Sequence, residues 1–323
     1  MTGLQSVLFV DDEPHLLSGL KRSLRPLRSE FKFEFASDGM QALDLLNQSK
    51  FDLVISDMRM PGMDGGELLA RVSESFPDTV RIILSGQASA ESLIRALPST
   101  HQYLPKPFRP ESLKELMHKL KSLRSIIPNA IMRSAISKVT RLPCRRELLE
   151  QFVSLLKNND YSARLWQVAQ GDIGISAQMM HLVVSTSRRE RFNYNSLPEA
   201  FATLGHEILE KLMWEELFYP VDSKFNGIDL IQLSHRGIRR AHAFAEIAKT
   251  RTPLAITEAY WAGIFYELGS IIKPPSGVDF KAANVINEKS KRKSGAYLLA
   301  LWGFPESIYR GILETPWRDD GKD

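Results

Sequence analysis

The sequence predicts two domains of different class: an α/β domain with a doubly wound, five-stranded parallel sheet, followed by an all-α domain. Three observations support this. The chain has 323 residues, which is long for a single domain. Five short apolar runs alternate with five helical patterns over roughly the first 120 residues, as is typical of a parallel sheet covered by helices on both faces. From about residue 138 onward the apolar residues follow helical spacing without strand alternation.

The α/β part can be followed element by element. Each predicted strand is a short apolar or alternating run, and the first helix has a proline at its start, where the missing N–H costs nothing. The predicted strands are Ser6–Val10, Phe31–Phe35, Leu53–Ile55, Val80–Leu84 and His101–Leu104. The first predicted helix follows Pro14 and the second begins at Asp38. Three more predicted helices span 64–75, 88–97 and 110–123.

Polar residues follow four of these strands: Asp11 and Asp12, then Asp57, Ser85 and Lys106. Because the carboxyl ends of parallel strands meet at one edge of a sheet, we expect these side chains to converge. Converging carboxylates would repel one another unless a hard cation lay among them, and Mg²⁺ takes a few carboxylates with waters and phosphate oxygens. A carboxylate can attack phosphorus, and the lysine and hydroxyl suit an added phosphoryl group.

Residues 4–122 resemble the receiver domain of two-component response regulators, which has a flavodoxin-like fold. Four motifs carry the resemblance and occur in the expected order at the strand ends. They are Val10-Asp11-Asp12, Ser56-Asp57-Met58-Arg59-Met60-Pro61-Gly62-Met63-Asp64-Gly65, Leu84-Ser85-Gly86 and Lys106-Pro107-Phe108.

The resemblance implies that Asp57 is the phosphoacceptor, receiving its phosphoryl group from a phosphohistidine of a sensor histidine kinase. It also implies Mg²⁺ as the cofactor. The metal ligands would be Asp11, Asp12, Asp57 and the main-chain carbonyl of Arg59, with Asp12 the more direct ligand of the acidic pair.

Three further positions take roles from the resemblance. Ser85 and Lys106 would contact the phosphoryl oxygens, and Tyr103 matches the position of a rotating aromatic switch. The stretch 97–101 departs from the usual lead-in to the last strand and shortens the surface that most receivers use for output. A homodimer therefore stays open as an expectation, without a stated mode.

A basic stretch follows the receiver. No acidic residue lies between Glu115 and Glu147, whereas eight lysines and arginines do. Two readings stay open: a solvated helical face, or a contact with nucleic acid or an acidic protein, although aromatic side chains for stacking are missing. We place the receiver at 1–122, this basic helical linker at 123–137 and the output domain at 138–323.

The output region resembles the HDOD domain, a relative of the HD phosphohydrolases, in the order and spacing of its landmarks. These are Leu142-Pro143, 170–177 (Gln-Gly-Asp-Ile-Gly-Ile-Ser-Ala), 197–205 (Leu-Pro-Glu-Ala-Phe-Ala-Thr-Leu-Gly), 262–269 (Ala-Gly-Ile-Phe-Tyr-Glu-Leu-Gly) and 295–305 (Gly-Ala-Tyr-Leu-Leu-Ala-Leu-Trp-Gly-Phe-Pro).

The metal-binding doublet of the catalytic relatives is missing. The chain contains no His-Asp dipeptide, and the corresponding place reads Tyr266-Glu267. A metal hydrolase needs three or more good ligands to activate water, so we expect no catalytic residue in the HDOD domain and no enzyme activity there. The histidines of this half are expected to pack in the core or lie on the surface; a remnant of a ligand pocket and a working metal site are the alternatives.

The function that follows is a response regulator of a phosphorelay, in which phosphorylation of Asp57 switches a non-catalytic HDOD domain that binds a protein partner. The alternative is a phosphorylation-gated HD-type phosphohydrolase acting on a cyclic dinucleotide. A DNA-binding regulator is a third hypothesis. Residues 1–122 contain 15 basic and 16 acidic residues, which leaves 27 and 22 for the rest, and this weak basicity argues against nucleic acid.

The composition predicts a cytoplasmic protein. The single cysteine, Cys144, excludes an internal disulfide and fits a reducing compartment. No run of about 18 apolar residues is present, so no membrane span is expected, and the start of the chain lacks the pattern of a secretion signal.

Overall fold

The computed structural model describes residues 5–86, 90–158, 160, 163–186, 217–249, 253–272 and 288–315. The chain forms two compact units, and the main boundary between them follows Thr140. We call residues up to Thr140 the first unit and the described residues from Arg141 onward the second unit. The landmark predicted at 197–205 lies outside the described residues.

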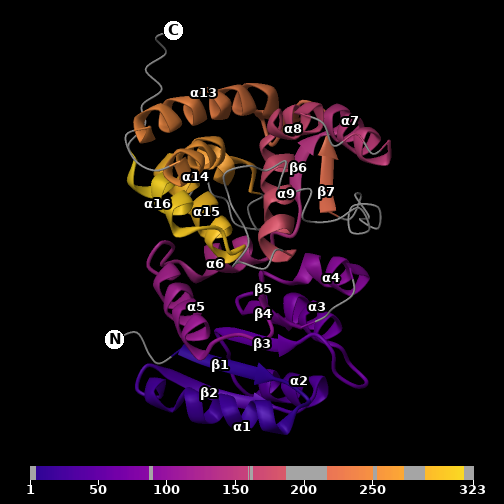
Figure 1. The fold of residues 1–323 in the computed structure, drawn as a ribbon, viewed down its shortest axis with the longest axis vertical. Helices are drawn as coiled ribbons and strands as arrows, with labels where there is room; N and C mark the ends of the chain where they lie inside the picture. Colours follow the sequence, from indigo (N-terminus) through magenta and orange to yellow (C-terminus); the bar gives the residue numbers. More distant parts are fainter. Residues whose placement is uncertain are drawn as a thin grey trace. The chain divides into compact units, whose positions relative to one another are not determined.

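The first unit contains the predicted sheet. All five strands are parallel, in the order β2-β1-β3-β4-β5 (Figure 1). The strands are β1 (Gln5–Val10), β2 (Phe31–Ala36), β3 (Leu53–Asp57), β4 (Val80–Ser85) and β5 (Gln102–Pro105). Every residue of the central strand β3 is buried, as expected when helices cover both faces. The prediction of a doubly wound parallel sheet is confirmed.

Helices flank this sheet, and local sequence explains their starts. Asp38 and Asp64 each accept a hydrogen bond from a main-chain N–H in the first turn of the helix that follows, which satisfies a donor that the helix leaves free. The helices are α1 (Pro14–Ser23), α2 (Gly39–Gln48), α3 (Gly65–Ser75), α4 (Ala90–Ala96) and α5 (Pro110–Leu123), with 3-10 turns η1 (Arg25–Leu27) and η2 (Leu97–Ser99).

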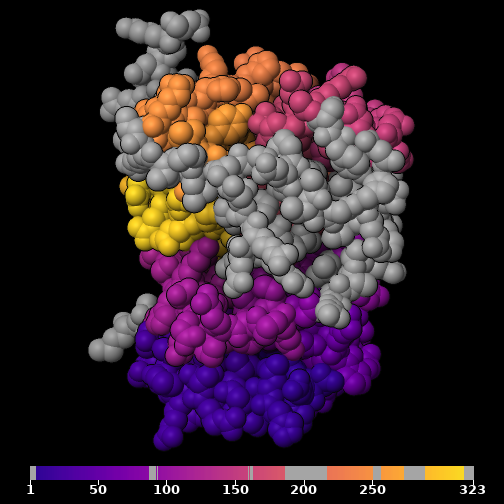
Figure 2. Space-filling model, viewed as in Figure 1, coloured from indigo at the N-terminus to yellow at the C-terminus, as the bar shows by residue number. Residues whose placement is uncertain are grey.

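The first unit extends beyond α5. Helix α6 (Ala130–Ser137) begins after Asn129, whose side chain accepts a hydrogen bond from the Met132 N–H at 3.1 Å. The stretch 123–137, predicted as a basic linker, thus belongs to the first unit, and residues 130–137 of it are helical. In space-filling view the side chains of the first unit form a closely packed surface on the face shown (Figure 2).

The second unit is helical, as predicted. Its helices are α7 (Arg146–Lys157), α8 (Ala163–Gln170), α9 (Ile173–Thr186), α13 (Leu230–Ala248), α14 (Pro253–Ile264), α15 (Glu288–Leu301) and α16 (Glu306–Glu314), with a long 3-10 segment η4 (Phe265–Ile271). None of the helices in the described part of the chain has the length and apolar character needed to cross a bilayer.

Four short strands of two to four residues add to the predicted helices. Strand β6 (Leu142–Arg145) pairs in parallel with β7 (Phe218–Val221), and β8 (Lys224–Phe225) forms a hairpin with β9 (Ile228–Asp229). The hairpin turns at Asn226-Gly227, both with positive φ, and this dipeptide is the strongest short hairpin signal in any sequence. The hairpin is hard to predict from sequence because strands this short show no alternation.

Close backbone approach explains two landmark glycines of the second unit. A Cβ on Gly269 would lie 1.8 Å from the Lys291 carbonyl oxygen, and a Cβ on Gly295 would lie 2.7 Å from the Gly269 nitrogen. The segment η4 and helix α15 therefore meet backbone to backbone, and any side chain at either position would push them apart. These glycines serve packing rather than chemistry.

Candidate functional site

The ends of four strands lie at one edge of the first unit's sheet. Val10 pairs with Ser56, Asp57 with Leu84, and Ser85 with Pro105 in the strand register. The residues that follow β1 and β5, Asp11 and Lys106, therefore leave the sheet at the level of Asp57. This is the edge where open α/β sheets place their ligands.

Asp57 is the centre of this edge and is only 8% exposed. Its Oδ1 forms an ion pair with Nζ of Lys106. Its Oδ2 accepts a hydrogen bond from the Arg59 main-chain N–H at 2.6 Å. The carboxylate is thus held in one orientation by one cation and one main-chain donor.

Asp11 shares the same cation. Its Oδ2 lies 2.7 Å from Lys106 Nζ, and its Oδ1 accepts from the Glu13 N–H at 2.9 Å. Burial opposes the charge of Lys106, but hydrogen bonds and charges from Asp11 and Asp57 outweigh it and raise the pKa of the ammonium group. Two buried carboxylates from different strands are therefore joined by one amine.

The other predicted residues lie around this core. Asp12 is exposed, and the described residues make no recorded contact with its carboxylate. Ser85 ends β4, and its carbonyl accepts from the Lys106 N–H at 2.7 Å. Tyr103 is 7% exposed, and burial raises the pKa of its phenol.

The turn after Asp57 depends on glycine. A Cβ on Gly65 would lie 2.1 Å from the Asp57 carbonyl oxygen, and the Gly65 N–H donates to the Met58 carbonyl at 3.0 Å. Gly62 has a φ of 77°, a conformation that favours glycine. The motif that the sequence analysis singled out therefore folds tightly against the acid it contains.

The donors at this edge suit Mg²⁺. This ion prefers oxygen ligands and is usually bound by one or two carboxylates together with waters and phosphate oxygens. Asp11 and Asp57 supply two buried carboxylates close enough to contact one nitrogen. No cluster of three or more histidine, cysteine or acidic side chains able to hold a metal occurs in the described ranges.

The second unit contains Tyr266 and Glu267, the pair that the sequence resemblance equates with the metal-binding doublet of catalytic relatives, and arginines surround them. Glu267 Oε2 accepts from Nη2 of Arg236 at 2.7 Å, and Oε1 accepts from Nη2 of Arg240 at 2.9 Å. The Arg240 side chain is 2% exposed and that of Glu267 is 14% exposed. Burial opposes ionisation, but the two guanidinium groups prevail and lower the pKa of Glu267.

Tyr266 is also engaged by cations. The Arg240 guanidinium lies 4.5 Å from the centre of its ring. Nη1 of Arg292 donates to the phenol oxygen at 2.7 Å, and the phenol donates to the Thr315 carbonyl at 3.0 Å. Both Tyr266 and Glu267 therefore contact guanidinium groups.

Other polar residues of the second unit have structural roles. His181 is 2% exposed and stacks on Trp302, with ring centres 4.2 Å apart. Asp172 is 1% exposed, and its carboxylate accepts from the N–H groups of Arg145, Gly174 and Ile175. Burial raises the pKa of this acid, against the effect of those hydrogen bonds. The landmark 170–177 therefore starts helix α9 rather than forming a reactive site.

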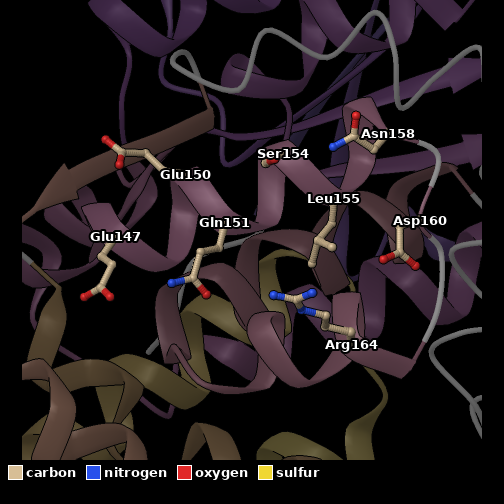
Figure 3. Close-up of a pocket in the computed structure, with 8 residues that line it drawn as sticks. All are labelled: Glu147, Glu150, Gln151, Ser154, Leu155, Asn158, Asp160 and Arg164. Atoms are coloured by element: carbon tan, nitrogen blue, oxygen red, sulfur yellow. The ribbon is translucent and has the colours of Figure 1, made fainter.

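A hollow of about 600 Å³ lies along α7 and α8 (Figure 3). Glu147 and Glu150 lie towards one end of it, and Asp160 lies at the other with Arg164 nearby (Figure 3). The carboxylates do not gather at one point, and the hollow contains none of the residues predicted to be functional.

Comparisons with known proteins match each unit to a family. Residues 7–118 match the family described as the response regulator receiver domain, and residues 142–273 match the HDOD domain.

Several curated regulators are similar to parts of this chain. The transcriptional regulatory protein GlrR of Escherichia coli is 32% identical over 222 residues, which is 68% of this chain and 47% of that protein. The response regulator MprA of a Mycobacterium species is 32% identical over 118 residues, 36% of this chain and 49% of that protein. This chain thus spans about half the length of these relatives.

Solved structures match part of this chain. The receiver domain of an HD domain-containing protein from Pseudomonas fluorescens is 33% identical, covers 39% of this chain and 92% of that one, and has a TM-score of 0.37. The chemotaxis response regulator CheY4 of Vibrio cholerae is 28% identical, covers 36% and 99%, and has a TM-score of 0.33.

Proposed function

Because this chain carries a response-regulator receiver domain followed by an HDOD domain, we propose that it is the phosphoacceptor of a phosphorelay. In this proposal Asp57 receives a phosphoryl group from a phosphohistidine of a sensor histidine kinase. The charge added at Asp57 then switches an HDOD domain that binds a protein partner. The observation that carries the proposal is the convergence of Asp57 and Asp11 on Lys106 at one edge of the sheet.

The geometry suits transfer to Asp57. An oxygen of its carboxylate would form the new bond to phosphorus while the bond from phosphorus to the histidine nitrogen breaks, and the imidazole leaves with the electron pair. The Arg59 N–H holds the other carboxylate oxygen, which orients the nucleophile. We assign Lys106 and Ser85 as the residues that would contact the phosphoryl oxygens, the lysine as a point charge.

Bound Mg²⁺ would neutralise the charge that gathers between the carboxylates and the incoming phosphoryl group. We assign its ligands as Asp11, Asp12, Asp57 and the Arg59 main-chain carbonyl. Asp12 would join from its exposed position after β1. Lys106 now supplies the positive charge shared by two acids, so it is the group whose contacts must change most when phosphate and metal bind.

Phosphorylation adds about 1.5 to 2 negative charges and three strong acceptor oxygens. Lys106 forms an ion pair with Asp57, and Ser85 ends the neighbouring strand β4. A shift of Ser85 towards the phosphoryl group would move the end of β4. Tyr103 lies on the neighbouring strand and is the proposed aromatic switch. Homodimerisation is a further proposed response to phosphorylation.

We also propose a cytoplasmic location, with which the free, buried thiol of Cys144 accords.

We propose that the HDOD domain is not an enzyme. Glu267 is the one acid of the doublet, and both of its oxygens bind arginines. A metal ion at this carboxylate would have to displace two guanidinium groups, one of them almost fully buried. Tyr266 stands in place of a histidine, and it is a poor metal ligand while its phenol group is protonated. The domain is therefore left to act by binding a protein.

The phosphoacceptor is tested by incubating the full chain with acetyl phosphate and Mg²⁺ and measuring its intact mass. We expect one phosphoryl group per chain, lost in Asp57→Asn. Asp44→Asn, at an exposed aspartate of α2, is the matched control and should be modified like the wild type. Unmodified wild-type protein, or equal modification of Asp57→Asn, would reject the receiver half of the proposal.

A phosphohydrolase gated by phosphorylation is the competing function. It requires tightly bound transition metals in the second unit, so metal analysis of the purified protein separates the two. We expect less than one equivalent of transition metal per chain. Two equivalents that are retained through dialysis and lost in Glu267→Gln would replace our proposal with the enzyme.

A further inference from the structure

A buried polar cluster lies at the ends of β4 and β5 opposite to Asp57. Arg81 is the second residue of β4, and His101 immediately precedes β5. Their side chains belong to residues that are 1% and 2% exposed. A guanidinium group removed from water this completely must have its donors satisfied, so its partners indicate what it is for.

The acceptors of the Arg81 guanidinium are main-chain carbonyls from three segments, and its Nη2 also lies 3.2 Å from Nε2 of His101. Nε donates to Ser99 at 2.7 Å, Nη1 to Thr79 at 3.0 Å and Nη2 to Ser137 at 2.9 Å. No carboxylate is recorded at this guanidinium among the described residues, and burial lowers its pKa to about 10. The side chain thus links the start of β4, the turn η2 and the end of α6.

His101 reinforces the link to α6. Its Nδ1 accepts from the Arg81 main-chain N–H at 3.0 Å, so in the neutral ring the proton resides on Nε2. That nitrogen lies 3.1 Å from the Ser137 carbonyl oxygen and donates to it. The hydrogen-bond network assigns this tautomer. One carbonyl therefore receives two donors, from β4 and from the start of β5.

Ser137 is the last residue of α6. The final carbonyls of a helix have no partner inside it and carry partial negative charge, so a guanidinium there stabilises the helix end. The other end of α6 is also tied, because Arg133 donates to the carbonyls of Ile127 and Pro128 at 2.8 and 2.6 Å. Three residues after Ser137, at Thr140, the first unit ends.

We propose that Arg81 and His101 form a latch that holds the end of α6 to β4 and β5, and that this latch couples the phosphoacceptor edge to the start of the HDOD domain. The coupling part rests on the proposed function. Ser85 and Tyr103 lie on the same two strands as the latch. Ser85 comes four residues after Arg81, roughly 13 Å along a strand, so a shift of β4 or β5 at one end reaches Ser137 at the other.

Two substitutions open the latch in different ways. Arg81→Lys keeps the charge but cannot reproduce three donors in a planar fork. His101→Asn keeps an acceptor near the position of Nδ1 but loses the donor to Ser137, whereas His101→Gln extends an amide to the position of Nε2 and should rescue. Arg71→Lys, in an exposed pair with Glu67 on α3, is the control.

Amide hydrogen exchange of the unphosphorylated full chain tests the latch itself. Residues 132–140 should exchange about tenfold faster in Arg81→Lys and His101→Asn. They should match the wild type in His101→Gln and Arg71→Lys. Wild-type exchange of this segment in both latch variants would overturn the proposal, and unchanged exchange of β1 and β3 verifies that the sheet is intact.

The coupling is tested by adding beryllofluoride and Mg²⁺ and following exchange in α7 and α9. Phosphoryl incorporation from acetyl phosphate should stay within about twofold of wild type in the latch variants, while the response of α7 and α9 is lost. A full response in a variant whose α6 exchanges fast would overturn the coupling. If the wild-type protein takes up no phosphoryl group, the proposed function is rejected. The exchange of α6 in the unphosphorylated variants would still test whether Arg81 and His101 hold the end of this helix.

Discussion

Replacing Glu267 by glutamine should destabilise the HDOD domain strongly, although it removes only a charge. The carboxylate compensates Arg240, whose side chain is 2% exposed, and Arg236, which is 33% exposed. Removing one partner of a buried ion pair costs about 3–5 kcal/mol because a charge stays buried without compensation. The Arg236 guanidinium is partly exposed and can be solvated by water, so the lower limit of this range applies. We expect the free energy of unfolding to fall by about 3 kcal/mol.

Tryptophan fluorescence in a urea titration measures this loss selectively, because all five tryptophans lie between residues 166 and 317. Glu306→Gln is the matched control: its partner Arg310 and Glu306 itself are more than half exposed, so the midpoint should hardly move. A loss for Glu267→Gln no larger than that of the control would refute the idea that this acid is held by buried arginines.

The same variant makes a prediction about pH. The pKa of Glu267 in the folded domain lies below its ordinary value of 4.5, so its stabilising contribution is complete above about pH 4.5 and is lost as the pH falls through the folded pKa. The stability difference between wild type and variant should be constant from about pH 5 to 8 and shrink below that range. A difference that grows on acidification would contradict this sign.

Two further substitutions test local geometry. Gly65→Ala places a Cβ 2.1 Å from the Asp57 carbonyl and should cost about 1–3 kcal/mol in urea unfolding followed by circular dichroism, whereas Gly19→Ala in α1, with nothing within 4 Å, should be neutral or stabilising; equal effects would refute the close contact. Asp172→Ala removes the acceptor at the start of α9 and should cost about 1–2 kcal/mol, while Asp172→Asn should recover most of it, and tryptophan fluorescence would show if it does not.

Much of the first unit could be predicted because its signals are local. The strands are short apolar or alternating runs, and the polar residues that follow four of them come next in the sequence. The parallel arrangement then brings those ends to one edge without further information. Asp57, Asp11 and Lys106 meet as the sequence analysis expected.

The clusters that sequence reasoning missed join distant positions. Arg81 and Ser137 are 56 residues apart, and Arg236 and Glu267 are 31 apart. An arginine in a strand or helix usually marks a solvated face, and no local pattern separates it from one that is fully buried. The sequence shows that Tyr266-Glu267 is not a His-Asp pair, but it could not show which groups surround these two residues.

The central claim is that charge added at Asp57 changes the HDOD domain. The most direct measurement is amide hydrogen exchange of α7, α9 and α13 in the full chain with and without beryllofluoride and Mg²⁺, for wild type and Asp57→Asn. We predict altered exchange in at least one of these helices in the wild type and none in the variant. Suppose that acetyl phosphate phosphorylates the wild-type protein at Asp57. If beryllofluoride and Mg²⁺ then leave the exchange of all three helices unchanged, the account is contradicted.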